Sequence, residues 1–345
     1  MRSNPRAQTI ESEAPAERIV KREDLSVDGA LLALSIKLIN NIMIKQLKDN
    51  LHFIDIFLDD IERLWFLKGY SPGIKEALIN KLANVYSGKI PGIMLFRDNA
   101  PIAFAWVDKI TENYGNMILH CLEIEDQALL ADSLVKTGLL NEALLEMIHF
   151  HEGSEAYCHA FRSAGLLENK RQRMGRLLET PINPPLLPPH LKLESLTKEH
   201  IPISSEISFK AHQISKDYKG YKDLETLEAR IQLEKHIFNK TYGPFIKDAS
   251  LILSHSDTYV GACPIVEIAC WGYDKVPWIF DMTIAPEFQK QGLGRILFTH
   301  CLDKLQKLGY PVVGLAVTCN NTRAINLYES LDFEVVEIFY EYAKP

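Results

Sequence analysis

The stretch DMTIAPEFQKQGLGRIL, residues 281–297, decides the fold of the second half of the chain. Its alternating apolar residues Met282 and Ile284 predict a strand that ends at Pro286. The next segment, Gln289 to Gly294, carries two glycines and leads into an amphipathic helical pattern. Glycines at such a turn let a ligand approach the backbone, and the unpaired amides of a first helical turn bind phosphate oxygens. The stretch therefore predicts a strand, a pyrophosphate-binding turn and a helix.

Two familiar phosphate-binding motifs do not fit this turn. The segment matches neither G-x-G-x-x-G nor the P-loop pattern G-x-x-x-x-G-K-[ST]. A dinucleotide-binding fold also needs an acidic residue after a parallel strand about 20 residues further on. The chain reads LDKLQKLGYPVV there, at residues 302–313. A dinucleotide site is therefore not expected.

The stretch resembles the acetyl-CoA signature of the GCN5-related N-acetyltransferase (GNAT) superfamily. That signature is [QR]-x-x-G-x-[GA], following a strand of the form L-x-V-x-P. The signature positions are filled by Gln289, Gly292 and Gly294, and the strand positions by Met282, Ile284 and Pro286.

A second resemblance lies at LAVTCNNTRAINLYESLDF, residues 315–333, which is similar to the strand and helix of the family form V-x-x-x-N-x-x-A-x-x-L-Y-x-x-x-G-F. The resemblance implies that Asn321 contacts the pantetheine arm, that Ala324 packs against it, and that the Tyr328 hydroxyl lies near the thioester sulfur. Asp332 stands where the family usually has glycine, and aspartate tolerates left-handed backbone better than most residues.

The resemblance implies an acetyl-CoA-dependent N-acetyltransferase in which an amine attacks the thioester directly. Tyr328 would then be the general acid, and the backbone amides of Met282 and Ile284 would hold the acetyl carbonyl and pantetheine. No metal is expected. The full cofactor-binding set that it implies is Met282, Thr283, Ile284, Gln289, Lys290, Gln291, Gly292, Leu293, Gly294, Arg295, Asn321, Ala324 and Tyr328.

The general base stays open among several residues. Glu267 and Asp281 are the two carboxylates next to the signature strand that could receive the ammonium proton, directly or through water. The histidines His212, His255 and His300 have a suitable ordinary pKa. Cys319 adjoins the second motif, but no base stands at a recognisable spacing from it, which indicates an inert strand cysteine.

The composition excludes several classes of protein and partner. The chain has 345 residues, 47% hydrophobic and 24% charged, which is ordinary for a globular protein and long enough for two domains. A net charge of −7 does not favour nucleic acid as a partner. The apolar stretch 29–47, expected to be an amphipathic helix, is interrupted by lysines and asparagines and cannot span a membrane.

Six scattered cysteines without a C-x-x-C pair or a histidine cluster argue against structural zinc and against a disulfide framework. They favour a reducing, cytoplasmic compartment, and residues 1–24 contain no apolar run of the kind found in signal peptides. The N-terminal tail and Glu334, Glu337 and Glu341 near the C-terminus would also suit an effector translocated into a host cell. These glutamates equally fit the solvent face of a last strand, which is the preferred interpretation.

The proline-rich segment TPINPPLLPPH, residues 180–190, divides the chain into two halves. In both halves helical patterns come first, strands follow, and the last elements alternate. The sequence predicts an α/β (α+β) protein of two GNAT-like domains, each a mixed, mostly antiparallel sheet flanked by helices. The expected boundaries are a flexible tail 1–28, a first domain 29–179, a linker 180–190 and a catalytic domain 191–345.

The first half lacks the signature residues. After its third strand the chain reads EIEDQALLADSL, residues 123–134, with acidic residues and no glycine where pyrophosphate would lie. The first half is therefore a degenerate copy or an unrelated α/β domain. Tandem architecture of this kind is similar to mycothiol synthase-type enzymes and to translocated bacterial effectors of the VipF type. The amine acceptor, a protein lysine or a small amine, stays open, and a non-catalytic CoA-binding scaffold or protein-interaction module is the alternative function.

Overall fold

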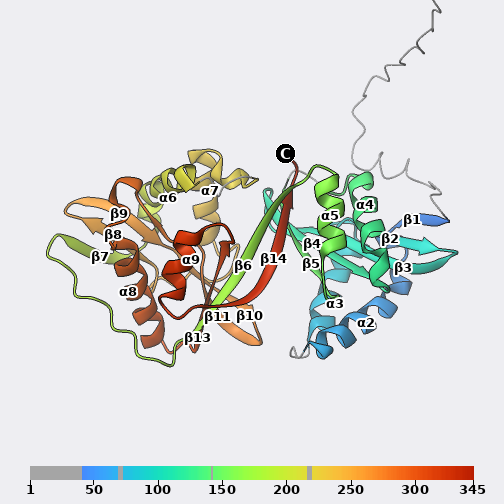
Figure 1. Cartoon of the computed structure of the whole chain (residues 1–345), viewed down its shortest axis with the longest axis horizontal. Helices are drawn as coiled ribbons and strands as arrows, with labels where there is room; N and C mark the ends of the chain where they lie inside the picture. The colour runs from blue at the N-terminus through green and yellow to red at the C-terminus, as the bar shows by residue number, and fades with distance from the viewer. Residues whose placement is uncertain (1–40, 69–72, 141–142, 216–219) are drawn as a thin grey trace, which may run out of the picture.

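The computed structural model describes residues 41–68, 73–140, 143–215 and 220–345. It contains a ten-stranded sheet in the order β1-β2-β3-β4-β5-β14-β6-β13-β11-β10 and a four-stranded sheet in the order β12-β9-β8-β7. Helices cover both sheets (Figure 1). The predicted fold class, a mixed, mostly antiparallel α/β arrangement repeated in two halves, is confirmed.

The first half begins with strand β1 (Ile42–Gln46) and helices α2 (Ile54–Leu67) and α3 (Ile74–Tyr86). Strands β2 (Gly92–Arg97), β3 (Ala100–Lys109) and β4 (Tyr114–Cys121) follow, then α4 (Gln127–Thr137), β5 (Leu144–His149), α5 (Glu155–Ser163) and β6 (Leu167–Leu177). One buried cluster joins α4 and α5 to the sheet, and another joins α2 and α3 to it. The two clusters take alternate residues of the same strands. Because successive side chains of a strand point to opposite faces of the sheet, the two helix pairs lie on opposite faces.

The second half repeats this order of elements. It begins with β7 (Leu191–Ser195), α6 (Ile201–Ser215) and α7 (Leu227–Phe238), followed by β8 (Leu251–His255), β9 (Thr258–Cys263), β10 (Ile265–Cys270), β11 (Tyr273–Ile279) and β12 (Thr283–Ile284). Helix α8 (Leu293–Lys307), β13 (Val312–Thr318), α9 (Thr322–Glu329) and β14 (Glu334–Ala343) complete it. The main buried cluster of this half includes side chains of α8 and of the segment from α9 to Phe333.

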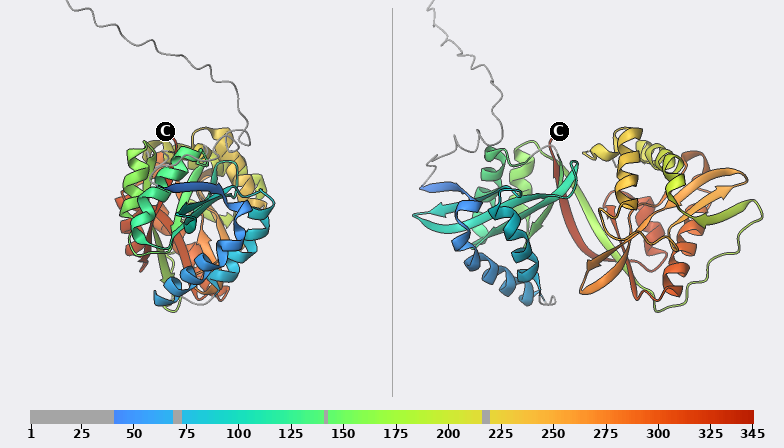
Figure 2. Two further views of the ribbon diagram at one scale, coloured as in Figure 1. Left: turned by 90° about the vertical axis from the view of Figure 1, so that its right-hand side faces the viewer. Right: turned by 180° about the vertical axis from the view of Figure 1, so that it is seen from behind.

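The two halves exchange their last strands. Strand β6 of the first half pairs with β13 of the second, and β14 of the second half pairs with β5 of the first. Strands β6 and β14 also pair with each other, and they cross side by side between the two halves in the front and rear views (Figures 1 and 2). The pairings on either side of this crossing mirror one another: β4 runs parallel to β5, and β11 parallel to β13. The sheet is therefore continuous through the molecule.

Ion pairs cover the crossing strands. Arg171 of β6 pairs with Glu341 of β14 at 3.1 Å, and Arg173 contacts both Glu146 and Glu337. Glu341 is 1% exposed, so its predicted place on the solvent face of the last strand is wrong. Burial raises the pKa of Glu341, and the Arg171 guanidinium and the Tyr221 hydroxyl act against that rise.

Some predicted elements differ from the structure. Residues 42–46, expected within a helix over 29–47, form strand β1, and residues 29–40 of that prediction, with the tail 1–28, lie outside the described residues. Strand β6 was not predicted, because its sequence LENKRQRMGRL is too polar to look like a central strand. Residues 181–188 form neither helix nor strand, and the domain boundaries remain a prediction.

All six cysteines are free, as predicted, and four of them are buried. In the ranges that the structure covers, every helix is too short or too polar to cross a bilayer.

Candidate functional site

The signature strand leaves its parallel neighbour just before the glycine turn. Strand β11 pairs with β13 only at Trp278–Gly314 and Ile279–Leu315. After Ile279 the chain changes sheets, and Thr283 and Ile284 pair with β9 instead. Strand β13 continues to Thr318, paired there only with β6. The pairing between the two central strands of this half therefore opens at their carboxyl ends, where α/β folds bind ligands.

The glycine turn places the start of α8 beside this opening. Gly292 precedes the helix with φ +80°, a left-handed conformation that glycine adopts without strain. No side chain caps this helix, and the first helical hydrogen bond is donated by Ile296 to the Gly292 carbonyl. The amides of Leu293, Gly294 and Arg295 thus lack partners within the helix. These three amides are the groups that the predicted anion-binding turn would offer to a ligand.

The side chains of the turn fix its shape. Gln289 donates to the Ile284 carbonyl at 2.8 Å and accepts from Arg323 of α9 at 2.6 Å, so it ties the turn to two elements. Lys290 has φ +63°, and Gln291 donates to the Glu287 carbonyl at 3.3 Å. The Arg295 guanidinium contacts the Ser330 hydroxyl.

The second motif forms the start of α9. The Asn321 side chain accepts a hydrogen bond from the Ala324 amide at 3.1 Å and thereby caps the helix. One turn later Tyr328 is 7% exposed, with its ring 5.5 Å from that of Phe298 and 6.0 Å from that of Phe333. No hydrogen bond joins its hydroxyl to another described residue. Burial raises the pKa of Tyr328, and the neighbouring Cys263 and Asp281 reinforce the rise, so the phenol is protonated at neutral pH.

Asp281 lies at the centre of a polar network where the strands separate. Its carboxylate accepts from the Ser208 hydroxyl at 2.6 Å and from Arg230 at 3.0 Å, and lies 3.4 Å from Nε2 of His212. Burial alone would raise the pKa of Asp281, but His212, Arg230 and Ser208 together hold it well below its usual range. The same carboxylate accepts from the Met282 amide at 2.9 Å, so this amide already has a partner.

The network continues into the protein. Arg230, 2% exposed, also pairs with the fully buried Glu234 at 2.8 Å, and Glu234 accepts from Ser204 at 2.9 Å. These partners come from α6 and α7, which carry no motif, and sequence reasoning missed all of them except His212. The negative charge of Asp281 is therefore stabilised by the buried Arg230, while His212 is 25% exposed.

The other candidate bases lie apart from this network. Glu267 accepts from the Tyr310 hydroxyl at 2.7 Å, and Tyr310 follows the last turn of α8, the end opposite Gly292. His300 hydrogen-bonds to the Pro185 carbonyl at 3.0 Å, and His255 packs on His190 and Phe288. The Cys319 thiol lies 3.9 Å from the Gln172 side-chain oxygen, and burial raises its pKa, as befits an inert thiol.

In the first half, the strands that correspond to β11 and β13 do not separate. Strands β4 and β5 stay paired through six positions, from Tyr114–Leu144 to Leu119–His149. The α4 helix begins after Asp126, whose carboxylate contacts Arg97. Gly138 ends this helix, whereas a glycine opens α8. The loss of a pyrophosphate site in this half remains a prediction.

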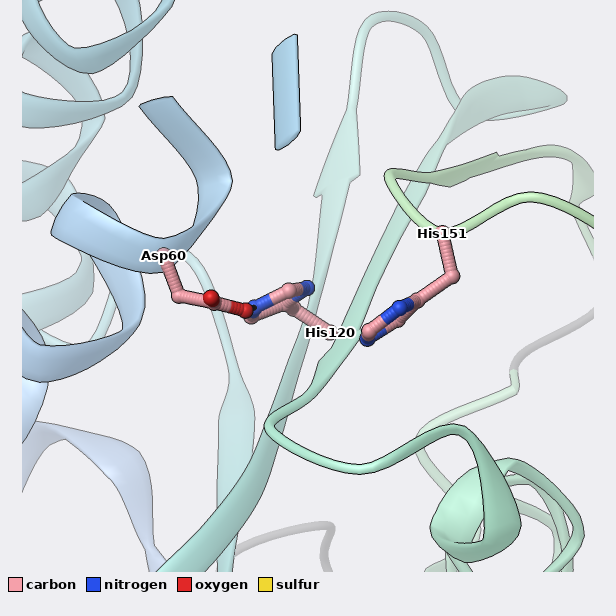
Figure 3. Close-up of side chains that lie close together, drawn as sticks. All are labelled: Asp60, His120 and His151. Atoms are coloured by element: carbon pink, nitrogen blue, oxygen red, sulfur yellow. Dashed lines mark hydrogen bonds and ion pairs between the residues drawn. The ribbon is translucent and has the colours of Figure 1, made fainter. Parts of the chain in front are cut away.

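At the same strand ends the first half holds a polar cluster that sequence reasoning missed. Asp60 of α2, His120 of β4 and His151 after β5 each offer a metal-ligating atom, and these atoms lie within 4.8 Å of one another (Figure 3). The three residues are 60 and 31 positions apart, and no local spacing joins them.

Residues 212–333 match the family model described as "Acetyltransferase (GNAT) family". The [Ribosomal protein bS18]-alanine N-acetyltransferase of Escherichia coli is 42% identical over 64 residues, 19% of this chain and 43% of that protein. Mycothiol acetyltransferase of Renibacterium salmoninarum is 39% identical over 62 residues, 18% of each chain. The chain thus covers less than half the length of these curated relatives.

A solved structure extends the likeness to both halves. The GCN5-related N-acetyltransferase of Sphaerobacter thermophilus aligns with a TM-score of 0.59 and 15% identity, over 89% of this chain and 96% of that one. At this identity the likeness concerns the fold alone.

Proposed function

We propose that this chain transfers an acetyl group from acetyl-CoA to a primary amine, because residues 212–333 match the GNAT acetyltransferase family model. The proposed working site lies in a catalytic domain, residues 191–345, preceded by the linker 180–190 and a degenerate domain, 29–179. The observation that supports it best is the separation of β12 from β13 directly before the uncapped start of α8. A thioester can lie between the separated strands while its diphosphate meets the free amides.

We assign the proton transfers to two groups near the opening. The amine must lose a proton before it attacks, and His212 is suited to accept it because one ring nitrogen faces the Asp281 carboxylate. Asp281 is a weak base, since its pKa is depressed, and it serves to orient His212. Tyr328, a protonated phenol, donates to the leaving thiolate. Glu267 stays a second candidate base. To accept a proton from the amine, it would have to give up the hydrogen bond that it accepts from the Tyr310 hydroxyl.

The acceptor is proposed only as a class. One relative is named for an alanine of a ribosomal protein and another for mycothiol, so their names span a protein amine and a small molecule. Both are compatible with direct attack by a neutral amine on the thioester.

Calorimetry with acetyl-CoA tests the proposal. The double variant Gly292→Val/Gly294→Val strains the left-handed turn and adds bulk at Gly294, where even a Cβ would touch Ile284 and Met282. We expect one site in the wild type and at least a tenfold loss of affinity in the variant. Gly309→Val is the matched control, because Gly309 has φ +84° at the opposite end of the same helix and equally open surroundings.

Equal affinity in the double variant and in Gly309→Val would contradict the proposed site. Binding without release of free CoA in the presence of protein and small amines would favour the non-catalytic scaffold instead. Turnover that His212→Ala leaves unchanged would return the base to Glu267.

A further inference from the structure

The polar cluster of the first half joins three separate elements at one point. Asp60 projects from α2, His120 from the last part of β4, and His151 from the loop after β5, with His120 between the other two (Figure 3). Oδ2 of Asp60 lies 3.1 Å from Nε2 of His120, and the two imidazole rings are stacked with centroids 5.2 Å apart. Two imidazoles and a carboxylate form a ligand set suited to divalent transition metals.

The place of the cluster in the fold is that of a ligand site. Strands β4 and β5 are parallel neighbours; His120 lies in the last part of β4, and His151 follows the end of β5. The corresponding ends of β12 and β13 flank the glycine turn in the second half. The cluster therefore occupies in the first half the position that the proposed acetyl-CoA site occupies in the second.

His120 offers Nε2 as its ligand atom. Its side chain is fully buried, and Nε2 lies against Oδ2 of Asp60, whereas Nδ1 has no partner within the described ranges.

His151 already has the outer contact of a metal ligand. Its Nε2 lies 2.5 Å from the Cys121 carbonyl oxygen, to which it must donate. This fixes the tautomer and leaves the lone pair on the other nitrogen, as in many metal sites where the second nitrogen of the ligand histidine bonds to a backbone carbonyl.

We propose that Asp60, His120 and His151 bind one divalent transition metal ion of the Zn²⁺ type, in a site separate from the acetyl-CoA site. The Asp60–His120 spacing of 3.1 Å is close to the separation of about 3.4 Å between ligands on a tetrahedral zinc ion. His151 lies on a loop and is partly exposed, so a small shift of this loop, which keeps the contact of Nε2 with the Cys121 carbonyl, brings the other ring nitrogen to the ion. Three protein ligands leave a coordination position for water.

Two positively charged side chains, Arg63 and Lys68, contact residues of the cluster. Arg63 contacts Oδ1 of Asp60 at 2.6 Å, which leaves Oδ2 for the ion, and Lys68 donates to the His151 carbonyl at 3.3 Å. Arg63 is 60% exposed and can turn into solvent when a second positive charge arrives.

Titration of the full chain with ZnCl2 or CoCl2, after treatment with a chelator, tests the site. We expect one equivalent of metal by calorimetry and elemental analysis, and a higher Tm with metal present. Asp60→Asn and His151→Ala should each weaken binding by on the order of 100-fold and abolish the rise in Tm. His159→Ala, an exposed histidine on α5 of the same half, is the matched control and should bind as the wild type does.

Both chosen variants avoid the fully buried His120, and their Tm without metal shows that they fold. The proposal is overturned if the wild type binds neither metal, or if both variants bind as tightly as His159→Ala. It is also overturned if His159→Ala loses binding to the same extent, because the ion would then be held by surface histidines.

Discussion

Single residues decide how charge is arranged in the second half, and Asp281 is the clearest case. It contacts Ser208, His212 and Arg230, which lie 51 to 73 positions away on two helices. The sequence motif predicted that Asp281 stands at the opening. It could not predict the partners, because a helix residue that pairs with a distant carboxylate leaves no spacing to find. The physical role of Asp281 therefore follows only from the folded contacts.

Replacing Asp281 with asparagine should destabilise the protein in a pH-dependent way. Its pKa is depressed in the folded state, so its contribution is fully present above the ordinary value of 3.8 and is lost as the pH falls towards the folded value. We expect a loss of about 1.5–3 kcal/mol near neutral pH, the range for hydrogen bonds to charged groups. Urea unfolding of wild type and variant at several pH values measures it.

The difference between the two proteins should shrink below about pH 4, because Asp281 becomes protonated first in the unfolded chain. Asp303→Asn is a control, since Asp303 makes only an i,i+4 ion pair with Lys307 on α8. A difference that stays constant down to pH 2 would show that Asp281 is not held in its charged form.

Replacing Tyr328 with phenylalanine should lower kcat without changing the affinity for acetyl-CoA. Tyr328→Phe keeps the ring that packs against Phe298 and Phe333 and removes only the hydroxyl. If that hydroxyl protonates the thiolate, acetyl-CoA affinity and Tm should hold while kcat falls by roughly 10- to 1,000-fold. Calorimetry and steady-state kinetics on the same preparation compare the two quantities. An unchanged kcat would assign the proton to a solvent water.

At the scale of elements, strand pairing distinguishes the two halves more sharply than sequence does. The acidic residues of 123–134 predicted the loss of a pyrophosphate turn, but they gave no sign that β4 and β5 stay paired through six positions. Likewise, the motif predicted a strand that ends at Pro286, and the structure places Thr283 and Ile284 in a short strand, β12, in a different sheet from β11. Periodicity identifies a strand, and pairing partners depend on the remainder of the chain.

Strand β6 was missed for a related reason. Arg171 and Arg173 look like surface residues in a sequence, and only the carboxylates Glu146, Glu337 and Glu341 make their burial tolerable. Those carboxylates lie on β5 and β14, so the information that makes β6 a central strand is spread over both halves.

At the scale of the whole molecule, the exchanged strands make each half dependent on the other. We expect fragments 1–179 and 180–345 to be unstable when expressed alone, since the first lacks β14 between β5 and β6, and the second lacks β6 between β13 and β14. Co-expression should restore a complex with the circular dichroism and the acetyl-CoA affinity of the intact chain.

A matched pair of fragments cut at 1–256 and 257–345, within the turn between β8 and β9, controls for chain cleavage itself. Cooperative unfolding of fragment 1–179 at the Tm of the intact protein would contradict the dependence of the halves.

The crossing of β6 and β14 also sets the order in which the chain can fold during synthesis. Arg171 and its partner Glu341 are 170 residues apart. Until β14 has been synthesised, β6 lacks one of its two neighbours, and the edge of β5 that pairs with β14 is open. The central sheet can close only after residue 343 has left the exit tunnel. Long-range pairing of this kind is slow, and it leaves these strand edges open to pairing with other chains during that interval.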